Sequence, residues 1–273
     1  RHRRPGLPSP PPPPPPASSP PTSMAPSSTS WTHGSISSEG RKGDCEQNAK
    51  AFCSQPPFLP KNFYLYIENH YHICYSIHTL LEVMILGKDG FERMLCFHCA
   101  PTFAGIKPAS LVSFQKSRFE DFDALLESYA TCFECKGITP VRLTEGEEYV
   151  LMLFYRRKLL ERILEQPAVI ALLARFGYRA SDALEAHLEY LSMRIRLQKS
   201  FPHEVGLFLG YPAEDVEGFI ENKGRDFACA GYWKVYANEE EARALFQRYT
   251  DCTERLCARL GRGTPMAELL EAV

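Results

Sequence analysis

The amino-acid sequence predicts an α+β fold: a single domain in which a small, mainly antiparallel sheet packs against several helices, with a disordered N-terminal extension before it. Two observations lead to this class. The apolar runs with strand character are few, and they do not alternate regularly with helical segments as in a doubly wound parallel sheet. The sequence also lacks a glycine-rich phosphate-binding loop of the Rossmann or Walker type.

Residues 1–90 are expected to form a leader outside the folded domain, which then spans residues 91–273. Of the 22 prolines, 12 fall within residues 1–26, and serine and threonine dominate residues 18–38. Such a segment buries too little apolar surface to offset chain entropy, so we expect it to be disordered. Leu81, Glu82 and Val83 can be encoded by a ribosome-binding sequence, so the leader is alternatively an artefact of translation upstream of the true start. A polyproline linker or ligand is the other interpretation.

The expected elements of the domain begin at residue 118. Residues 118–133 carry apolar side chains at helical spacing, and Gly137 is suited to end that helix. Residues 138–143 and 149–155 are two apolar runs around a polar turn, which predicts an antiparallel hairpin. A charged helix over residues 157–165 follows, and then a short apolar helix between Pro167 and Gly177.

Four further elements are expected after Gly177. Ser181 is the predicted N-cap of a helix that reaches about residue 199. A helix starts at Pro212 and ends before Gly224, and residues 232–236 form a strand. Asn238 and Glu241 have the spacing of a capping box for the last helix. Its predicted apolar side consists of Leu245, Tyr249, Cys252 and Leu256.

Charge and hydropathy narrow the possible partners. Residues 91–273 contain 23 basic and 27 acidic side chains, which argues against nucleic acid as the main partner. The run Arg156-Arg157-Lys158 is interpreted as the solvated start of a helix. The apolar residues 63–86 are interrupted by charged residues and histidines, so no membrane span is predicted. No secretory signal is recognisable, and we therefore expect a cytoplasmic protein.

The cysteines suggest a metal site, but a structural explanation is preferred. Cys96 with Cys99 and Cys132 with Cys135 form two C-x-x-C pairs that could share a zinc ion. The distance between the pairs is long, and the second lies at a predicted helix C-terminus, where the dipole disfavours thiolates. Buried free cysteines are the preferred interpretation, and no metal site is predicted. A cluster of Cys229, Cys252 and Cys257 is disfavoured because positions 252 and 257 diverge by about 140° on a helix.

A thiol-based active site is a second hypothesis. Cys99 would be the nucleophile, His203 the base and Glu204 the carboxylate that orients the base. His98 would point away from Cys99 if that segment were a strand. The alternative is that His203, which follows Pro202, is an ordinary helix-start or surface residue.

Aromatic side chains surround a lysine near the end of the domain. Tyr211, Trp233 and Tyr236 with Lys234 are suited to bind a small ligand or a protein partner. Packing over a sheet is the preferred explanation of the rings. In a regular strand, Lys234 would point away from Trp233.

Two motifs resemble those of a known family. The first is His98-Cys99-Ala100-Pro101-Thr102 followed by Lys107, and the second runs from His203-Glu204 to Tyr236. Both are similar to motifs of a clostridial-type (Firmicutes) family of uncharacterised bacterial proteins, domain of unknown function 3793, over about residues 91–273. The resemblance implies seven polar residues as site candidates: His98, Cys99, Lys107, His203, Glu204, Asn222 and Lys234.

The resemblance implies a function only in outline. It is consistent with an accessory protein that binds a small ligand, a metal or a protein partner in an iron or redox context. The alternative is a cysteine-dependent enzyme with Cys99 and His203 in the roles given above. The sequence leaves the cofactor, the ligand and any protein partner unknown, and it predicts neither nucleic-acid binding nor membrane insertion.

Overall fold

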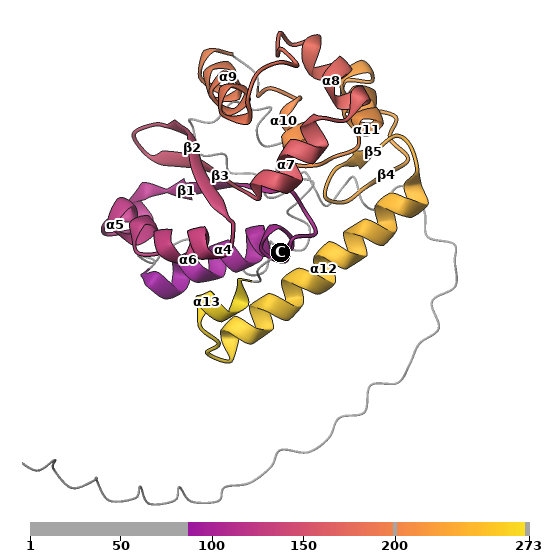
Figure 1. Cartoon of the computed structure of the whole chain (residues 1–273). Helices are drawn as coiled ribbons and strands as arrows, with labels where there is room; N and C mark the ends of the chain where they lie inside the picture. Colours follow the sequence, from indigo (N-terminus) through magenta and orange to yellow (C-terminus); the bar gives the residue numbers. More distant parts are fainter. Residues whose placement is uncertain (1–86, 199–200, 271–273) are drawn as a thin grey trace, which may run out of the picture. The chain divides into compact units, whose positions relative to one another are not determined.

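The computed structural model describes residues 87–198 and 201–270, and its architecture is α+β, as predicted (Figure 1). Helices lie on both faces of a small antiparallel sheet. The predictions for the leader, residues 1–86, lie outside the described residues. None of the helices within the described part is long and apolar enough to cross a membrane.

The main sheet has the strand order β1-β3-β2 and is antiparallel throughout. β3 (Tyr149–Tyr155) lies in the centre, between β1 (Ala109–Gln115) and β2 (Thr139–Glu145). The predicted hairpin is confirmed as β2 and β3, with a register shift between Arg142 and Thr144. β1 was not predicted from the sequence, and it pairs with β3 along its whole length.

Two hydrophobic cores lie on opposite faces of β3. Val150, Met152 and Phe154 belong to the core that contains α4 (Lys88–Phe103) and α12 (Glu239–Gly261). The alternate residues of β3 belong to the other core, because successive side chains of a strand point to opposite faces. That second core includes α7 (Arg157–Leu164), α8 (Pro167–Ala174), α9 (Leu184–Leu197) and α10 (Val205–Phe208).

The predicted helix over residues 118–133 is wrong as a continuous element. A 3-10 turn, η1 (Lys116–Arg118), precedes two short helices, α5 (Phe122–Glu127) and α6 (Ala130–Cys135). Asp121 accepts a hydrogen bond from the backbone N–H of Ala124 at 2.9 Å and so caps α5. Gly137 follows α6 with φ +66°, the left-handed conformation expected after a helix end.

The helices predicted for the second half of the domain are confirmed, but two of their predicted caps are wrong, and the strand predicted over residues 232–236 covers only Lys234–Val235. Pro167 opens α8, and Gly177 after it has φ +91°. Ser181 is not the N-cap of α9, since Ala183 holds that position without a side-chain cap. The capping box at Asn238 is also absent, because Asn238 is left-handed (φ +48°) and its side chain makes no cap hydrogen bond. The remaining elements are α11 (Ala213–Glu221), β4 (Cys229–Ala230), β5 (Lys234–Val235) and α13 (Met266–Leu269).

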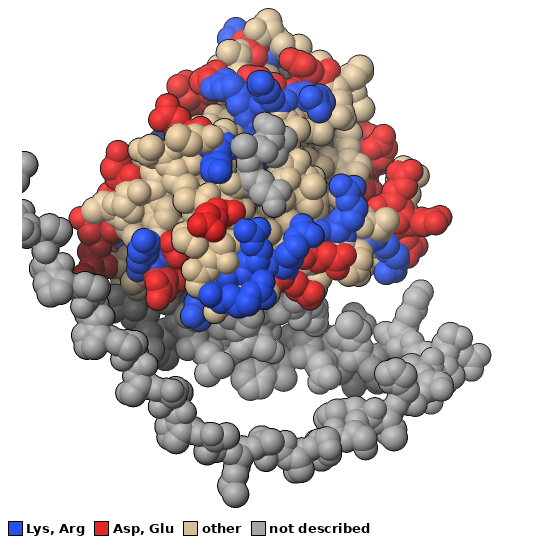
Figure 2. All heavy atoms as spheres, turned by 60° about the horizontal axis from the view of Figure 1, so that its bottom comes forward, with Lys and Arg blue, Asp and Glu red and all other residues tan. Residues whose placement is uncertain are grey.

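Arg156 has a structural position that the basic run did not predict. Its side chain is buried, whereas Arg157 and Lys158 are exposed. Its Nε donates to the carbonyl of Thr102 at 2.7 Å, and a terminal nitrogen donates to the carbonyl of Lys136 at 2.8 Å. Arg156 therefore satisfies carbonyl groups at the ends of both α4 and α6. On the face shown in Figure 2, basic and acidic side chains lie interspersed.

Candidate functional site

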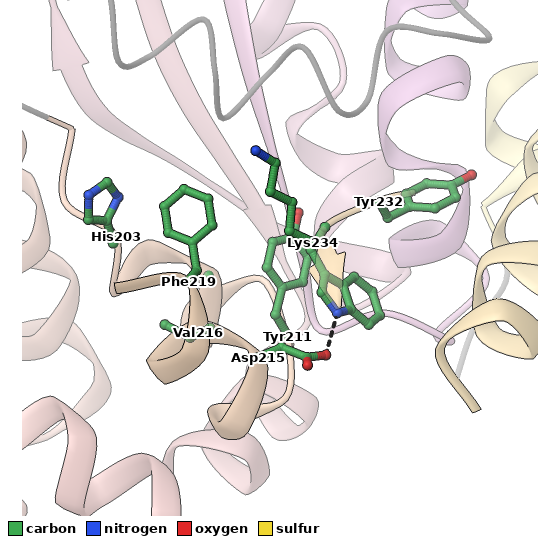
Figure 3. Close-up of a pocket in the computed structure, with 9 residues that line it drawn as sticks. His203, Tyr211, Asp215, Val216, Phe219, Tyr232 and Lys234 are labelled. Carbon is green, nitrogen blue, oxygen red and sulfur yellow. Dashed lines mark hydrogen bonds between the residues drawn. The ribbon is translucent and has the colours of Figure 1, made fainter. Parts of the chain in front are cut away.

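A small pocket lies between the second motif's helices and β5 (Figure 3). Its volume is about 30 Å³, enough for one or two water-sized groups. Most of its wall is aromatic or aliphatic, and three ionisable side chains interrupt that wall. The lining residues are His203, Gly206, Tyr211, Asp215, Val216, Phe219, Tyr232, Trp233 and Lys234.

Gly206 on α10 allows the base of the pocket to close tightly. A Cβ atom at this position would lie 3.0 Å from Cγ2 of Val216 and 3.1 Å from Cδ2 of Tyr211. Contacts of this length are tighter than ordinary van der Waals separation, so a larger residue would displace one of these neighbours. The glycine therefore lets α10 approach α11 and brings Tyr211 into the pocket wall.

Tyr211 and Trp233 stack against each other in this wall. Their ring centroids are 4.8 Å apart with an interplanar angle of 27°. The expectation that Lys234 points away from Trp233 is wrong, since both residues line the pocket. Trp233 precedes the two-residue strand β5 and lies in a bend, where the alternation of a regular strand does not apply. Tyr236 does not line this pocket.

Asp215 holds this aromatic segment against α11. It is 2% exposed and accepts three hydrogen bonds, from Trp233 Nε1 at 2.6 Å and from the backbone N–H groups of Tyr236 and Ala237 at 2.7 and 2.9 Å. The three donors compensate the negative charge of the buried carboxylate. The charge is also favoured because Asp215 lies in the first turn of α11, at the positive end of the helix dipole. Asp215 was not among the predicted site residues, although an Asp at a helix start within the motif was a usable signal.

Lys234 lines the same pocket, with its ammonium on the side of His203, which we call the mouth (Figure 3). Its ammonium donates to the carbonyl of Gly224 at 2.9 Å and lies 4.8 Å from the ring centroid of Phe227. The turn that it contacts contains left-handed residues at Lys223 (φ +52°), Gly224 (φ +70°) and Asp226 (φ +57°). Non-glycine residues in this conformation are strained, so the lysine stabilises an unusual turn beside the pocket.

Asn222 lies outside the pocket. Its side-chain amide donates to the carbonyl of Gly218 at 2.8 Å, where it caps the C-terminus of α11. The residue is exposed. Its observed contact is therefore structural, and its predicted role in ligand binding stays a prediction.

His203 lines the pocket on the side opposite Tyr211 and Tyr232 (Figure 3). Its half-buried ring lies 5.1 Å from the ring of Phe219, centroid to centroid. Within residues 87–198 and 201–270, neither ring nitrogen has a hydrogen-bond partner. Burial lowers the pKa of His203, and the nearby Glu204 carboxylate opposes that change. The imidazole is therefore mainly neutral near pH 7, with one donor and one acceptor to offer.

Glu204 faces away from the pocket, toward α9. It is fully buried, forms an ion pair with Nε of Arg194, and lies 3.5 Å from the hydroxyl of Tyr178. No hydrogen bond is formed between Glu204 and the ring of His203 among the described residues. A buried ion pair of this kind fixes the start of α10 against α9, and removing one partner would leave an uncompensated charge.

The first motif places Cys99 and Lys107 in the interior. Cys99 on α4 is 0% exposed, and burial raises the pKa of its thiol, which the positive charge of Lys107 opposes. Lys107 is 4% exposed, and burial lowers its pKa to about 8. Its ammonium lies 5.6 Å from the ring centroid of Tyr211 and has no hydrogen-bond acceptor among the described residues. Thr102 and Ser110 share a hydrogen bond of 2.8 Å near the same helix end.

The candidate residues therefore fall into separate groups. His203 and Lys234 meet at the pocket, whereas Cys99, which interacts with Lys107, does not line it. His98 is half-buried on α4, with its ring 5.1 Å from that of Phe97. The strand considered for Cys99 and His98 is wrong, since both lie on a helix about 100° apart around its axis.

The cysteines of the C-x-x-C pairs differ in their surroundings. Cys96 and Cys99 are free and buried, Cys132 is half-buried, and Cys135 is exposed. Burial raises the pKa of Cys96 to about 12, and the neighbouring Cys257 adds to that effect. Across the part of the chain that the structure describes, no group of three or more His, Cys, Asp or Glu side chains is placed to hold a metal ion.

The fold and the pocket define an α+β protein with a small aromatic site formed by its second motif. Comparison with protein families gives the identity: the model of a family described as "Protein of unknown function (DUF3793)" matches residues 95–270. The chain belongs to this family, and the match includes both motifs. No curated protein and no solved structure matches the chain.

Proposed function

We propose that the protein binds a small ligand and that the pocket between α10, α11 and β5 is the binding site. The observation that carries the proposal is the convergence of His203 and Lys234, which are distant in sequence, on one aromatic-lined cavity. Small-molecule sites are typically apolar concavities with a few polar groups that orient the ligand. The ring nitrogens of His203 have no hydrogen-bond partner in the described part of the chain and can serve that purpose.

The position of each polar group supports the same proposal. The aromatic rings of Tyr211 and Trp233 offer flat apolar surface, and the Lys234 ammonium and the His203 imidazole lie on one side of the pocket, at the mouth defined above. Asp215 is already engaged by three donors, so it acts as part of the wall. The pocket thus has an apolar interior and a polar, positively charged mouth.

Binding of a metal or catalysis by a cysteine has less support. A metal would need several ligands, and His203 is the one imidazole in this pocket lining. A cysteine nucleophile needs a lowered thiol pKa and access to substrate, whereas Cys99 is enclosed and burial raises its pKa. Action in an iron or redox context remains part of the proposal only as an implication of the family resemblance. A cytoplasmic location remains part of it only as the expectation drawn from the sequence.

A fragment screen tests the proposal. Full-length protein is mixed with several hundred fragment-sized compounds, and binding is detected by saturation-transfer NMR on the compounds. Val216→Ile adds one methylene group to a cavity of about 30 Å³ and should abolish binding while keeping every polar group. Lys223→Gln, an exposed residue outside the lining, is the matched control and should leave binding unchanged.

The screen can contradict the proposal directly. Expected is a set of compounds that bind the wild type and Lys223→Gln but not Val216→Ile. If every bound compound also binds Val216→Ile equally well, or if none binds the wild type, this pocket is not a ligand site.

A further inference from the structure

The charge around the pocket favours an acidic ligand. Lys234 provides a positive charge at the mouth, and Lys107 provides another behind Tyr211, with its ammonium 5.6 Å from the ring centroid. Asp215 is the one carboxylate in the lining, and three hydrogen-bond donors compensate its charge. Within the lining, an anion at the mouth therefore meets cationic groups, and the one carboxylate there is already compensated.

Lys107 is an independent observation in favour of an anion. It is 96% buried, and its ammonium has no hydrogen-bond acceptor within residues 87–198 and 201–270. Burying most of a charged lysine side chain is costly, and the face of one aromatic ring compensates only part of that cost. A negative charge that binds on the far side of Tyr211 would lower the cost, because Coulomb interactions are stronger in a partly buried, low-dielectric site.

The size of the cavity restricts the rest of the ligand. About 30 Å³ accepts one or two water-sized groups, which corresponds to a tail of one to three carbon atoms. The interior walls are the side chains of Tyr211, Val216 and Phe219, which favour an apolar tail over a polar one. Figure 3 shows the polar ends of His203 and Lys234 on the same side of the pocket, with Phe219 between them.

We infer that the ligand is a short-chain monocarboxylate. Its tail occupies the cavity beside Val216, and its carboxylate lies at the mouth, where the Lys234 ammonium and a ring N–H of His203 donate to it. This inference rests on the proposed function, since it assigns a ligand class to the same pocket.

The test compares four probes that share a three-carbon skeleton. Propionate, propionamide, 1-propanol and propylamine are titrated into full-length Trp31→Phe protein, in which Trp233 is the remaining one of the two tryptophans and reports on the pocket by its fluorescence. Propionate should bind at least about tenfold more tightly than propionamide, since hydrogen bonds to charged groups are the stronger ones. Among formate, acetate, propionate, butyrate and hexanoate, affinity should rise to propionate or butyrate and then fall.

Two variants test whether the preference for propionate over propionamide arises at the mouth of the pocket. Lys234→Gln should remove the tenfold preference for propionate over propionamide, because the charged donor is replaced by a neutral one. Lys223→Gln is the matched control in the neighbouring turn and should retain the preference. Thermal unfolding of both variants checks that each is folded at the titration temperature.

The outcomes separate this inference from the proposed function. If propionamide or propylamine binds as tightly as propionate, or if Lys234→Gln retains the preference, the carboxylate class is wrong. If no three-carbon probe binds, but fragments bind the wild type and not Val216→Ile, the short-chain carboxylate assignment is wrong and the pocket is still a ligand site. If neither acids nor fragments bind, both proposals fall.

Discussion

Asp215 connects α11 to the aromatic segment that follows β4. Its two oxygens accept from one indole and two backbone donors, all within 2.9 Å. A carboxylate in this position determines where Trp233 lies and where the chain turns toward α12. The residue is therefore central to the shape of the pocket even though it offers nothing to a ligand.

Replacing Asp215 by Asn should destabilise the protein by about 2 to 4 kcal/mol. The change keeps the side-chain shape but removes the charge and turns one acceptor into a donor that faces other donors. The free energy of unfolding in urea measures the loss. Glu214→Gln, which alters an exposed carboxylate one residue earlier, should change stability by less than about 0.5 kcal/mol. Equal effects of the two variants would contradict the role given to Asp215.

Lys107 should make stability depend on pH in the alkaline range. Burial lowers its pKa to about 8, below its ordinary value of 10.5, so the unfolded chain binds more protons than the folded one between these values. Below pH 8 the buried amine is charged, and the full cost of burying that charge lowers the stability of the folded state. As the pH rises from 8 toward 10.5, the folded state keeps the amine neutral and this destabilisation disappears. Relative to Lys107→Met, the wild type should thus gain up to about 3 kcal/mol between pH 7 and pH 10.

Urea unfolding at several pH values measures this difference. Subtracting Lys107→Met removes the contributions of the tyrosines and thiols that titrate in the same range. Lys158→Met, at an exposed position, should give a difference from wild type that does not change with pH. A flat profile for Lys107→Met as well would show that the amine is solvated.

At the scale of elements, α11 depends on close contact with the segment after β5. Gly218 lies inside this helix, and a Cβ atom there would be 2.6 Å from Cγ and 2.7 Å from Cβ of Tyr236. These atoms are near the backbone and cannot rotate away. The glycine is therefore retained in spite of its low helix propensity.

Gly218→Ala should destabilise the protein by about 1 to 3 kcal/mol, because the steric conflict exceeds the gain in helix propensity. Gly261 is the matched control, since it ends α12 and a Cβ atom added there would have no neighbour within 4 Å. Gly261→Ala should raise stability by up to about 1 kcal/mol. Thermal unfolding of both variants tests the prediction, and a stabilising Gly218→Ala would contradict it.

Element prediction from the sequence succeeded where the pattern is local. The hairpin of β2 and β3 and the helices that begin near Pro167 and Pro212 follow from periodicity and proline positions. The strand β1 was missed because its polar and apolar residues do not alternate regularly. Its strand conformation depends on pairing with β3. The helix α4 was missed for a related reason: Pro101 lies inside it, and its buried face is recognised only against α12.

For the whole molecule, the cysteines offer a direct test of which surfaces are enclosed. Cys99 and Cys96 are fully buried, whereas Cys135 is exposed. In native protein at pH 7, iodoacetamide should alkylate Cys135 and leave Cys99 unmodified, since burial raises the pKa of the Cys99 thiol. Peptide mass spectrometry after a timed reaction measures both positions, and urea-unfolded protein provides the fully reactive reference.

The same experiment decides on the alternative function. A Cys99 thiol that reacts faster than Cys135, and that loses this reactivity in His203→Ala, would support a cysteine-dependent enzyme and contradict the enclosed environment described above. Slow modification of Cys99 at the rate of global unfolding agrees with a core residue.

The site could be predicted from the sequence only in part. His203 and Lys234 were named from the second motif, and the structure brings them to one pocket with Tyr211 and Trp233. The partner of Glu204 was not predictable, because Arg194 belongs to another helix and their contact depends on how α9 packs on α10. Distances between separate elements are set by tertiary packing, which leaves no periodic trace in the sequence.

The contact between Lys107 and Tyr211 should constrain which residues occur at positions 107 and 211 in other members of the family. Lys107 belongs to the first motif and Tyr211 to the second, and beside them a Cβ atom on Gly210 would lie 2.5 Å from Cγ of Pro108. Residues 107–108 and 210–211, about a hundred residues apart in the sequence, are thus packed directly against each other. A larger side chain in either segment would displace the other segment. We expect positions 107 and 211 to covary among relatives, so that a family member without the lysine also replaces the tyrosine.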